Sequence, residues 1–156
     1  MKTRSVIALV GLAISFALPI FAQEQSAVDP KTRQEIEAVL MQIGEAYNKH
    51  DAAAVAALYT HDAVRVDNPP GMGRGALIVS RKAIEKLFET DFTGSWSSSP
   101  RVGKLVQIYA FEDSIASISE WSRAQYNGHS VQIFVRDPDT WKIRMEYNSV
   151  APVVTH

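Results

Sequence analysis

The sequence contains no cysteine among its 156 residues. A disulfide is therefore excluded, and so is a lipid attached through a cysteine at a signal-cleavage site. The chain also lacks a run of basic residues, and its formal net charge is -1. Because nucleic-acid binding needs a basic face, this class of partner is set aside. The fold must be held together by its core alone.

Long hydrophobic runs are missing as well. The uncharged run from Val6 to Leu18 is shorter than the ~20 apolar residues of a membrane-spanning helix. Lys2 and Arg4 precede this run, and Ala22 follows it before a polar stretch. This order predicts a signal peptide at residues 1–22, with an uncleaved N-terminal anchor as the alternative. We therefore expect a secreted or periplasmic protein of one domain, free of the membrane after cleavage.

Common catalytic and metal-binding motifs are absent too. The four histidines, at 50, 61, 129 and 156, show no ligand-like spacing, so no metal site is expected. The chain has no G-x-S-x-G motif, which argues against nucleophilic catalysis of that kind. No cofactor is expected either.

The first part of the mature chain is predicted to form three helices after a flexible segment at residues 23–31. The first helix has an apolar stripe at helical spacing, made by Ile36, Leu40, Ile43 and Tyr47. Asp51 is expected to cap a second helix that reaches Tyr59, and Ser80 a third. A short strand at 63–66 and a loop at 68–75 fall between the last two helices.

The last third of the chain is predicted to be a β-meander with strands at 102–111, 115–126, 129–136 and 141–150. Asn127-Gly128 is the strongest hairpin signal in the sequence, because both positions tolerate a positive φ. Helices followed by a run of strands indicate an α+β fold.

Counting strand pairs outward from this turn gives the sheet two unlike faces. One face mixes aromatic and polar groups, namely Trp121, Arg123, Gln125, Ser130, Gln132 and Phe134. The other is more apolar and includes Val131, Ile133, Val135, Ile143, Met145 and Tyr147. Either the mixed face lines a ligand pocket and the apolar face meets a second subunit, or the apolar face is the core and the mixed face is solvated.

Three segments resemble the NTF2-like superfamily, in particular its SnoaL-like/DUF4440 branch. They are AYNKHDAAAVAALYTHDAVRVD (46–67), GRGALIVSRKAIEKLF (73–88) and WKIRMEYNS (141–149). The resemblance covers residues 32–150, before a tail at 151–156. It implies a cone in which three N-terminal helices pack on a curved antiparallel sheet around a pocket. It favours the mixed face as the pocket lining and the apolar face as a homodimer interface. The implied binding residues are Trp121, Arg123, Gln132, Arg144, Glu146 and Asn148.

The same resemblance bears on activity. The general base of ketosteroid isomerase-like proteins follows a D-A-x-x-x-D pattern, which here ends at Asp67. The two oxyanion donors of the isomerase fall at Ile43 and near Gln132, so neither donor is present, and steroid isomerase chemistry is disfavoured. The alternative role for Asp67 is to cap the turn that follows it.

Two functions stay open at this stage. One is a cofactor-free acid–base catalyst of the isomerase, cyclase or dehydratase type, acting on a small carbonyl compound. Asp67 would be its base, and Arg123, Arg144 or Gln132 would stabilise the developing negative charge. The other is a non-catalytic extracytoplasmic protein that binds a small ligand. The resemblance also includes a non-enzymatic relative, the calcium/calmodulin-dependent kinase association domain, so a pocket alone does not imply catalysis.

Overall fold

The computed structural model describes residues 28–68, 75–94, 99–124 and 126–152. The expected signal peptide lies outside these residues, so the secreted or periplasmic location stays a prediction. Within the described chain no helix is long and apolar enough to cross a membrane. The elements are α1 (Pro30–Asn48), α2 (Ala52–Ala56), β1 (Tyr59–Asn68), β2 (Ala76–Val79), α3 (Arg81–Asp91), β3 (Val102–Ala110), β4 (Ser114–Arg123), β5 (Tyr126–Asp137) and β6 (Thr140–Pro152).

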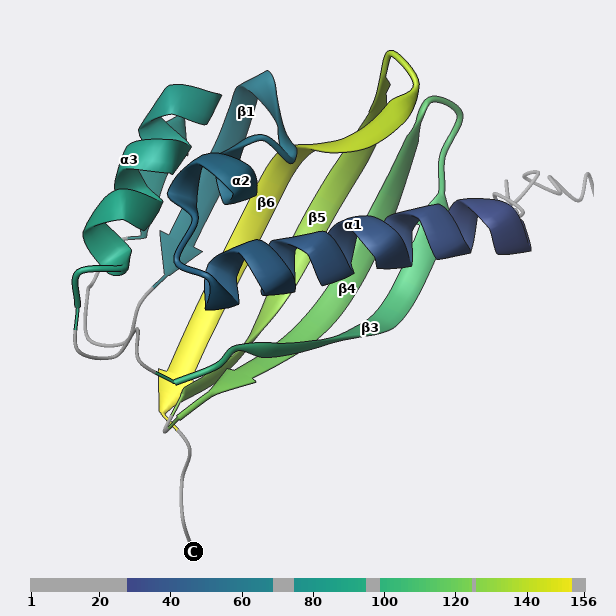
Figure 1. The fold of residues 1–156 in the computed structure, drawn as a ribbon. Coiled ribbons are helices and arrows are strands. Elements are labelled where there is room, and N and C mark those ends of the chain that lie inside the picture. Colours follow the sequence, from purple (N-terminus) through teal and green to yellow (C-terminus); the bar gives the residue numbers. More distant parts are fainter. Residues whose placement is uncertain (1–27, 69–74, 95–98, 125, 153–156) are drawn as a thin grey trace, which may run out of the picture.

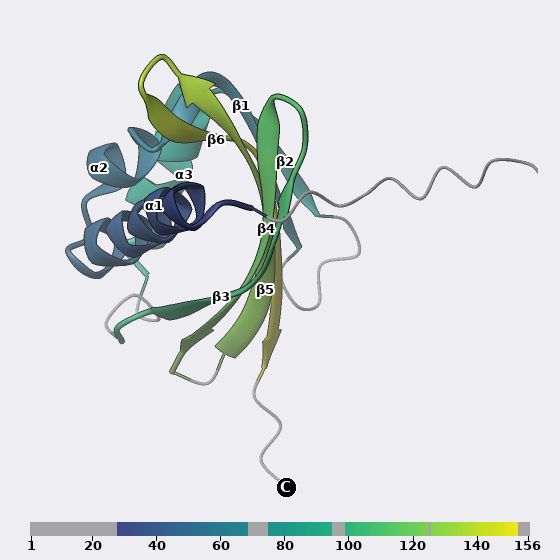
Figure 2. The same ribbon diagram turned by 90° about the vertical axis from the view of Figure 1, so that its right-hand side faces the viewer.

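The strands form a single sheet in the order β2-β1-β6-β5-β4-β3 (Figure 1). Among the strands of the described residues, β1 and β6 run parallel and every other neighbouring pair is antiparallel. Figure 2 shows the three helices on one side of this sheet, with the edge strand β3 curling toward α1. The prediction of an α+β fold with three helices on a curved, mostly antiparallel sheet is confirmed.

The helix starts follow from local capping. Asp51 and Ser80 accept hydrogen bonds from the backbone N–H groups of Ala54 and Ala83, at 2.9 and 3.3 Å, as predicted. The helix α1, however, begins at Pro30, inside the segment expected to be flexible. Asp29 accepts from the Thr32 N–H at 3.0 Å, and a proline follows it. An acidic cap followed by proline is a helix start signal that the sequence prediction overlooked.

Two predictions around β1 are wrong in detail. The second helix ends at Ala56, and Tyr59 belongs to β1 instead, where its side chain is buried. The strand β2 was not predicted, although its residues pair with Val64 to Asp67 of β1. A four-residue apolar run has too little periodicity to distinguish a strand from the start of a helix.

The turn between β4 and β5 lies earlier than predicted. Arg123 pairs with Tyr126 across it, and Trp121 pairs with Gly128 rather than with Phe134. Gly128 is needed for space, because a Cβ there would lie 1.9 Å from the Ser149 carbonyl oxygen and 2.5 Å from the Trp121 ring. The displacement of the pairing is an even number of residues, so every side chain keeps its predicted face.

The mixed face of the sheet is the concave face that meets the helices. Trp121, Arg123, Ser130, Gln132 and Phe134 are all buried there, while Gln125 lies outside the described residues. The alternative in which this face is solvated is therefore wrong. Its apolar part packs against α1 and α3 in one core, which includes Ile36, Ile43, Tyr47, Ile84, Phe88, Ile115, Phe134 and Ile143.

A β-bulge interrupts the alternation of β6. Ile133 pairs with Met145 but Phe134 pairs with Ile143, so Arg144 is an extra residue. Ile143 therefore shares the concave face with Glu146 and is fully buried, which corrects its predicted place on the outer face. The expectation that Arg144 lies beside Glu146 and Asn148 is also wrong. Its side chain is 54% exposed and pairs with Asp62 at 2.9 Å.

The convex face keeps the apolar character that the sequence indicates. Val131, Met145 and Tyr147 are 40%, 50% and 44% exposed on it. The homodimer through this face stays a prediction, and sedimentation of the full chain at micromolar concentration is the measurement that tests it.

Replacing Gly128 with alanine should destabilise the protein. The added methyl group meets backbone on one side and a buried ring on the other, and such overpacking costs about 1–3 kcal/mol. The control is Gly44→Ala in α1, where a Cβ meets nothing within 4 Å, so this change should add up to about 1 kcal/mol of stability. Urea unfolding of both variants measures the difference, and equal midpoints would contradict the packing argument.

Candidate functional site

The centre of the concave face is a buried ion pair between Arg65 and Glu146. The parallel pairing of β1 with β6 sets these two residues side by side. Their side chains are only 4% and 3% exposed, and Arg65 Nη1 contacts Glu146 Oε2 directly. The Tyr59 hydroxyl donates to the same carboxylate oxygen and accepts from Arg65 Nη1 at 3.0 Å. Three groups from two strands thus bond to one another inside the protein.

The pKa values of this cluster follow from burial and charge together. Burial raises the pKa of Glu146, but the Arg65 charge and the hydrogen bonds from Tyr59 and Gln132 outweigh it, so the pKa is lowered overall. Burial lowers the pKa of Arg65, but its electrostatic interactions with Glu146, Tyr59 and Asp67 together outweigh it, and the net pKa lies well above the ordinary value. Burial and the Glu146 charge raise the pKa of Tyr59. At neutral pH the pair is charged and the tyrosine is protonated.

A row of amide and hydroxyl groups extends this cluster across the sheet. Gln132 Nε2 donates to Glu146 Oε1 at 3.2 Å, and Gln132 Oε1 accepts from the Ser117 hydroxyl at 2.8 Å. Both ends of the Gln132 side chain are therefore held. On the neighbouring row, Asn148 Oδ1 accepts from Trp121 Nε1 and from the Ser130 hydroxyl, each at 2.9 Å. These bonds fix the orientation of the indole.

Asp67 lies at the end of β1, beside the ion pair. Its side chain is 16% exposed, and its Oδ1 is 2.8 Å from Arg65 Nη2. This contact has the distance of an ion pair but not the geometry of a hydrogen bond. Neither Asp67 Oδ1 nor Arg65 Nε has a hydrogen-bond partner in the described part of the chain. Asp67 is therefore a partly buried site carboxylate next to an arginine.

A second carboxylate, Asp91, stands near Asp67 at the end of α3. Burial raises its pKa to about 6, and the Asp67 charge adds to the rise, while Arg65 and Arg123 oppose it. The sequence prediction missed Asp91 because a charged residue that ends a helix usually belongs to its solvated side.

Two arginines surround Tyr47 of α1. Arg123 is buried and donates from Nη1 to the Tyr47 hydroxyl at 2.6 Å and from Nε to the Ser99 carbonyl at 2.8 Å. The guanidinium carbon of Arg101 lies 5.2 Å from the Tyr47 ring centroid and 4.7 Å from that of Trp121. Burial lowers the pKa of Arg101, and the Glu146 charge partly offsets the effect. Arg101 therefore contacts two aromatic rings at once.

A cavity of about 590 Å³ opens between α1 and β3 and reaches this cluster. Leu40, Ile43 and Leu105 supply apolar wall, and Arg101 supplies charge. Of the predicted binding residues, Trp121, Gln132 and Glu146 line this cavity. Asn148 reaches it through its bond to Trp121, whereas Asp67, Arg123 and Arg144 are not among the lining residues.

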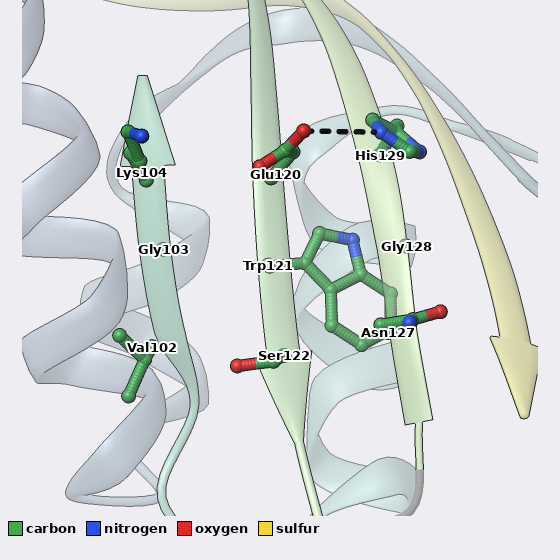
Figure 3. A pocket seen from close by; sticks show the side chains of 9 residues that line it. All are labelled: Val102, Gly103, Lys104, Glu120, Trp121, Ser122, Asn127, Gly128 and His129. Atoms are coloured by element: carbon green, nitrogen blue, oxygen red, sulfur yellow. Dashed lines mark ion pairs between the residues drawn. The ribbon is translucent and has the colours of Figure 1, made fainter. Parts of the chain in front are cut away.

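A second hollow, of about 410 Å³, involves the strands β3, β4 and β5 (Figure 3). Its charged residues lie on the solvent side, where His129 Nε2 is 3.6 Å from Glu120 Oε1 and both side chains are more than half exposed. Figure 3 also shows Trp121 between Gly103 and Gly128, the two residues that pair with it. The missing side chain of Gly128 leaves room for the indole, because a Cβ there would lie 2.5 Å from the ring, whereas a Cβ on Gly103 would meet only the Glu120 carbonyl oxygen.

Among the residues the structure describes, no group of three or more His, Cys, Asp or Glu side chains could hold a metal ion. The polar groups of the site are arginine, carboxylate, amide and hydroxyl. They can bind a small polar or charged molecule, and Asp91, whose pKa is raised to about 6, can exchange a proton near neutral pH.

Comparison with known proteins identifies the fold. A cystatin-like domain of unknown function from Nostoc punctiforme aligns with a TM-score of 0.66 at 13% identity, covering 78% of each chain. An NTF-2 like protein of unknown function from Shewanella oneidensis aligns at 0.64 and 16%, covering 76% of this chain and 98% of the other. A ketosteroid isomerase-like protein from Erwinia carotovora atroseptica aligns at 0.62 and 16%, covering 80% and 100%.

These likenesses establish an NTF2-like, or cystatin-like, α+β fold and nothing about activity, because the identities are low. No protein-family model matches the chain. No curated protein matches it either.

Replacing Glu146 with glutamine should leave the buried Arg65 charge without a counterion and cost about 3–5 kcal/mol at pH 7. Because the folded pKa of Glu146 is lowered, its contribution is present above the unfolded pKa of about 4.3 and is lost as pH falls through the folded pKa. The variant should therefore lose less stability than the wild type between pH 7 and pH 3.

Unfolding in urea across this pH range measures the effect. The control is Glu37→Gln, which breaks the half-exposed pair with Arg33 and should cost less than about 1 kcal/mol. Similar losses of unfolding free energy in the two variants would mean that the buried pair contributes no more to stability than the exposed one.

Proposed function

We propose that this chain is an extracytoplasmic binding protein that holds a small, partly apolar molecule in the cavity between α1 and β3. The cavity itself is the observation that carries the proposal. Its volume of about 590 Å³ falls in the ordinary range for small-ligand sites. Aliphatic side chains and Trp121 supply apolar surface, and Arg101, Gln132 and Glu146 supply a few convergent polar groups. We also place the chain in the SnoaL-like/DUF4440 branch, on the sequence segments that resemble it.

The state of the polar groups favours binding over catalysis. Gln132 is held at both ends, and Glu146 is ionised and shared among Arg65, Tyr59 and Gln132. Groups held in this way give a ligand fixed partners but do not readily take up or release a proton. The position that bears the oxyanion tyrosine in the isomerases is Ile43, which lines this cavity.

A second candidate function is acid–base catalysis on a small carbonyl compound, of the isomerase, cyclase or dehydratase type. The pair of carboxylates at the end of β1 and α3 is the specific observation in its favour. Asp67 would take the proton, and Asp91, whose pKa of about 6 is close to neutral, would exchange it with water. Arg123 or Gln132 would stabilise the enolate oxygen, while the exposed Arg144 pairs with Asp62 instead.

Filling the cavity should weaken binding without unfolding the protein. Gly103 lines the cavity, and a Cβ there meets only the Glu120 carbonyl oxygen at 3.8 Å, so Gly103→Leu should fold and occupy the space. We expect the affinity for 2-naphthamide, a neutral planar probe, to fall by roughly tenfold or more, as ~1.4 kcal/mol of lost contact implies.

Isothermal titration calorimetry measures this affinity. The control is Val106→Leu, on the same strand but exposed and outside the cavity lining, and it should bind as the wild type does. Unchanged binding by the Gly103→Leu variant would remove this cavity as the site.

Replacing Asp67 with asparagine tests the catalytic candidate. If Asp67 is a base, the wild type should accelerate deuterium uptake next to the carbonyl of 2-tetralone in D₂O, and Asp67→Asn should lower that rate by roughly 10²-fold or more. The control Asp113→Asn changes an exposed turn residue and should leave the rate unchanged. Nuclear magnetic resonance follows the exchange. No acceleration by the wild type, or an equal rate in the Asp67→Asn variant, would exclude this role.

A further inference from the structure

Arg101 is fixed in place before it meets any ligand. It lies just before β3, where Asn48 of α1 accepts from its N–H at 2.7 Å and donates to its carbonyl at 3.1 Å. Its guanidinium carbon is within about 5 Å of the Trp121 and Tyr47 rings. Two reciprocal backbone bonds and two ring contacts therefore set where the charge of this side chain points.

The N–H groups of this guanidinium remain to be satisfied. Across the described residues, Arg101 makes no side-chain hydrogen bond or ion pair, whereas the buried Arg65 and Arg123 each donate to described neighbours. Aromatic rings contact the flat face of a guanidinium and leave its edge of N–H donors open. A carboxylate matches that edge with two parallel hydrogen bonds, which neither ring provides.

The other charged residues of the cavity determine which ligand charge it favours. The remaining cation on the lining is Lys104, which is exposed and lies opposite Glu120 in the strand register, on the solvent side of the sheet. Glu146 at the inner end keeps its negative charge beside Arg65. Arg101 is thus the one cation among the described lining residues that is not fully exposed, and with an anion nearby it favours a ligand with a single negative charge over a dianion such as phosphate.

We propose that the ligand of the cavity is an aromatic or otherwise planar organic monocarboxylate, held through its carboxylate by Arg101. This inference rests on the proposed binding function and narrows it to a chemical class. The planar body lies against Leu40, Ile43 and Leu105, and a hydroxyl or amino substituent on it can reach Gln132 and Glu146 at the inner end.

The test compares 2-naphthoate with its neutral analogue 2-naphthamide by isothermal titration calorimetry on the full mature chain. The wild type should bind the carboxylate roughly tenfold or more tightly than the amide, because a charge-assisted pair of hydrogen bonds is present only in the first. Arg101→Gln should bring the two affinities together by weakening the carboxylate alone. Arg101→Lys, which keeps the charge but not the fork, should retain an intermediate preference.

The matched control is Arg144→Gln, which removes an exposed arginine outside the cavity and should keep the full preference. Equal affinities of the wild type for both probes would overturn the carboxylate class while leaving the binding function standing. Binding of neither probe would count against the binding function itself. Displacement of 2-naphthoate by millimolar inorganic phosphate would overturn the single-charge preference. If Arg101→Gln fails to fold, the wild-type and Arg101→Lys measurements decide alone.

Discussion

The buried pair of Arg65 and Glu146 is the constraint on which the rest of the concave face depends. Two charges enclosed by protein must be matched to each other and to further hydrogen bonds, or the fold loses several kcal/mol. Tyr59 and Gln132 are positioned for that purpose, and Ser117 in turn holds Gln132. The pair also joins β1 to β6, which are parallel neighbours in the sheet. The strand order that places β1 next to β6 is therefore also what brings the two charges together.

The concave face serves as core and as site at once. Phe134 and Ile143 pack against the helices, while Gln132 and Glu146, on the same two strands, face the cavity. An apolar residue in the first group adds stability through its burial, and a polar residue in the second is tolerated only because its partners are built in. The site can therefore be polar without exposing the interior to water.

Most of the fold was predictable because its signals are local. The caps at Asp51 and Ser80 and the alternation of β4 and β5 depend on neighbours within a few residues. The turn predicted at Asn127-Gly128 was misplaced because Gly128 serves the packing of Trp121 and not a turn. The strand alternation holds nevertheless, because the pairing is displaced by an even number of residues. Arg65, Tyr59, Asp91 and Arg101 escaped prediction because nothing near them in sequence shows burial. Their importance depends on contacts such as that of Tyr59 with Glu146, which are 87 residues apart.

The bulge at Arg144 has a consequence for what the concave face can hold. Before the extra residue, the odd-numbered Trp141 and Ile143 face the core. After it, the even-numbered Glu146 and Asn148 face the same concave side, at the site. The first half of the strand therefore supplies the core, and the second half supplies the buried polar groups of the same face. Without the bulge an unbroken alternation would place Ile143 and Glu146 on opposite faces, so one concave face could not hold both the apolar core and the buried ion pair.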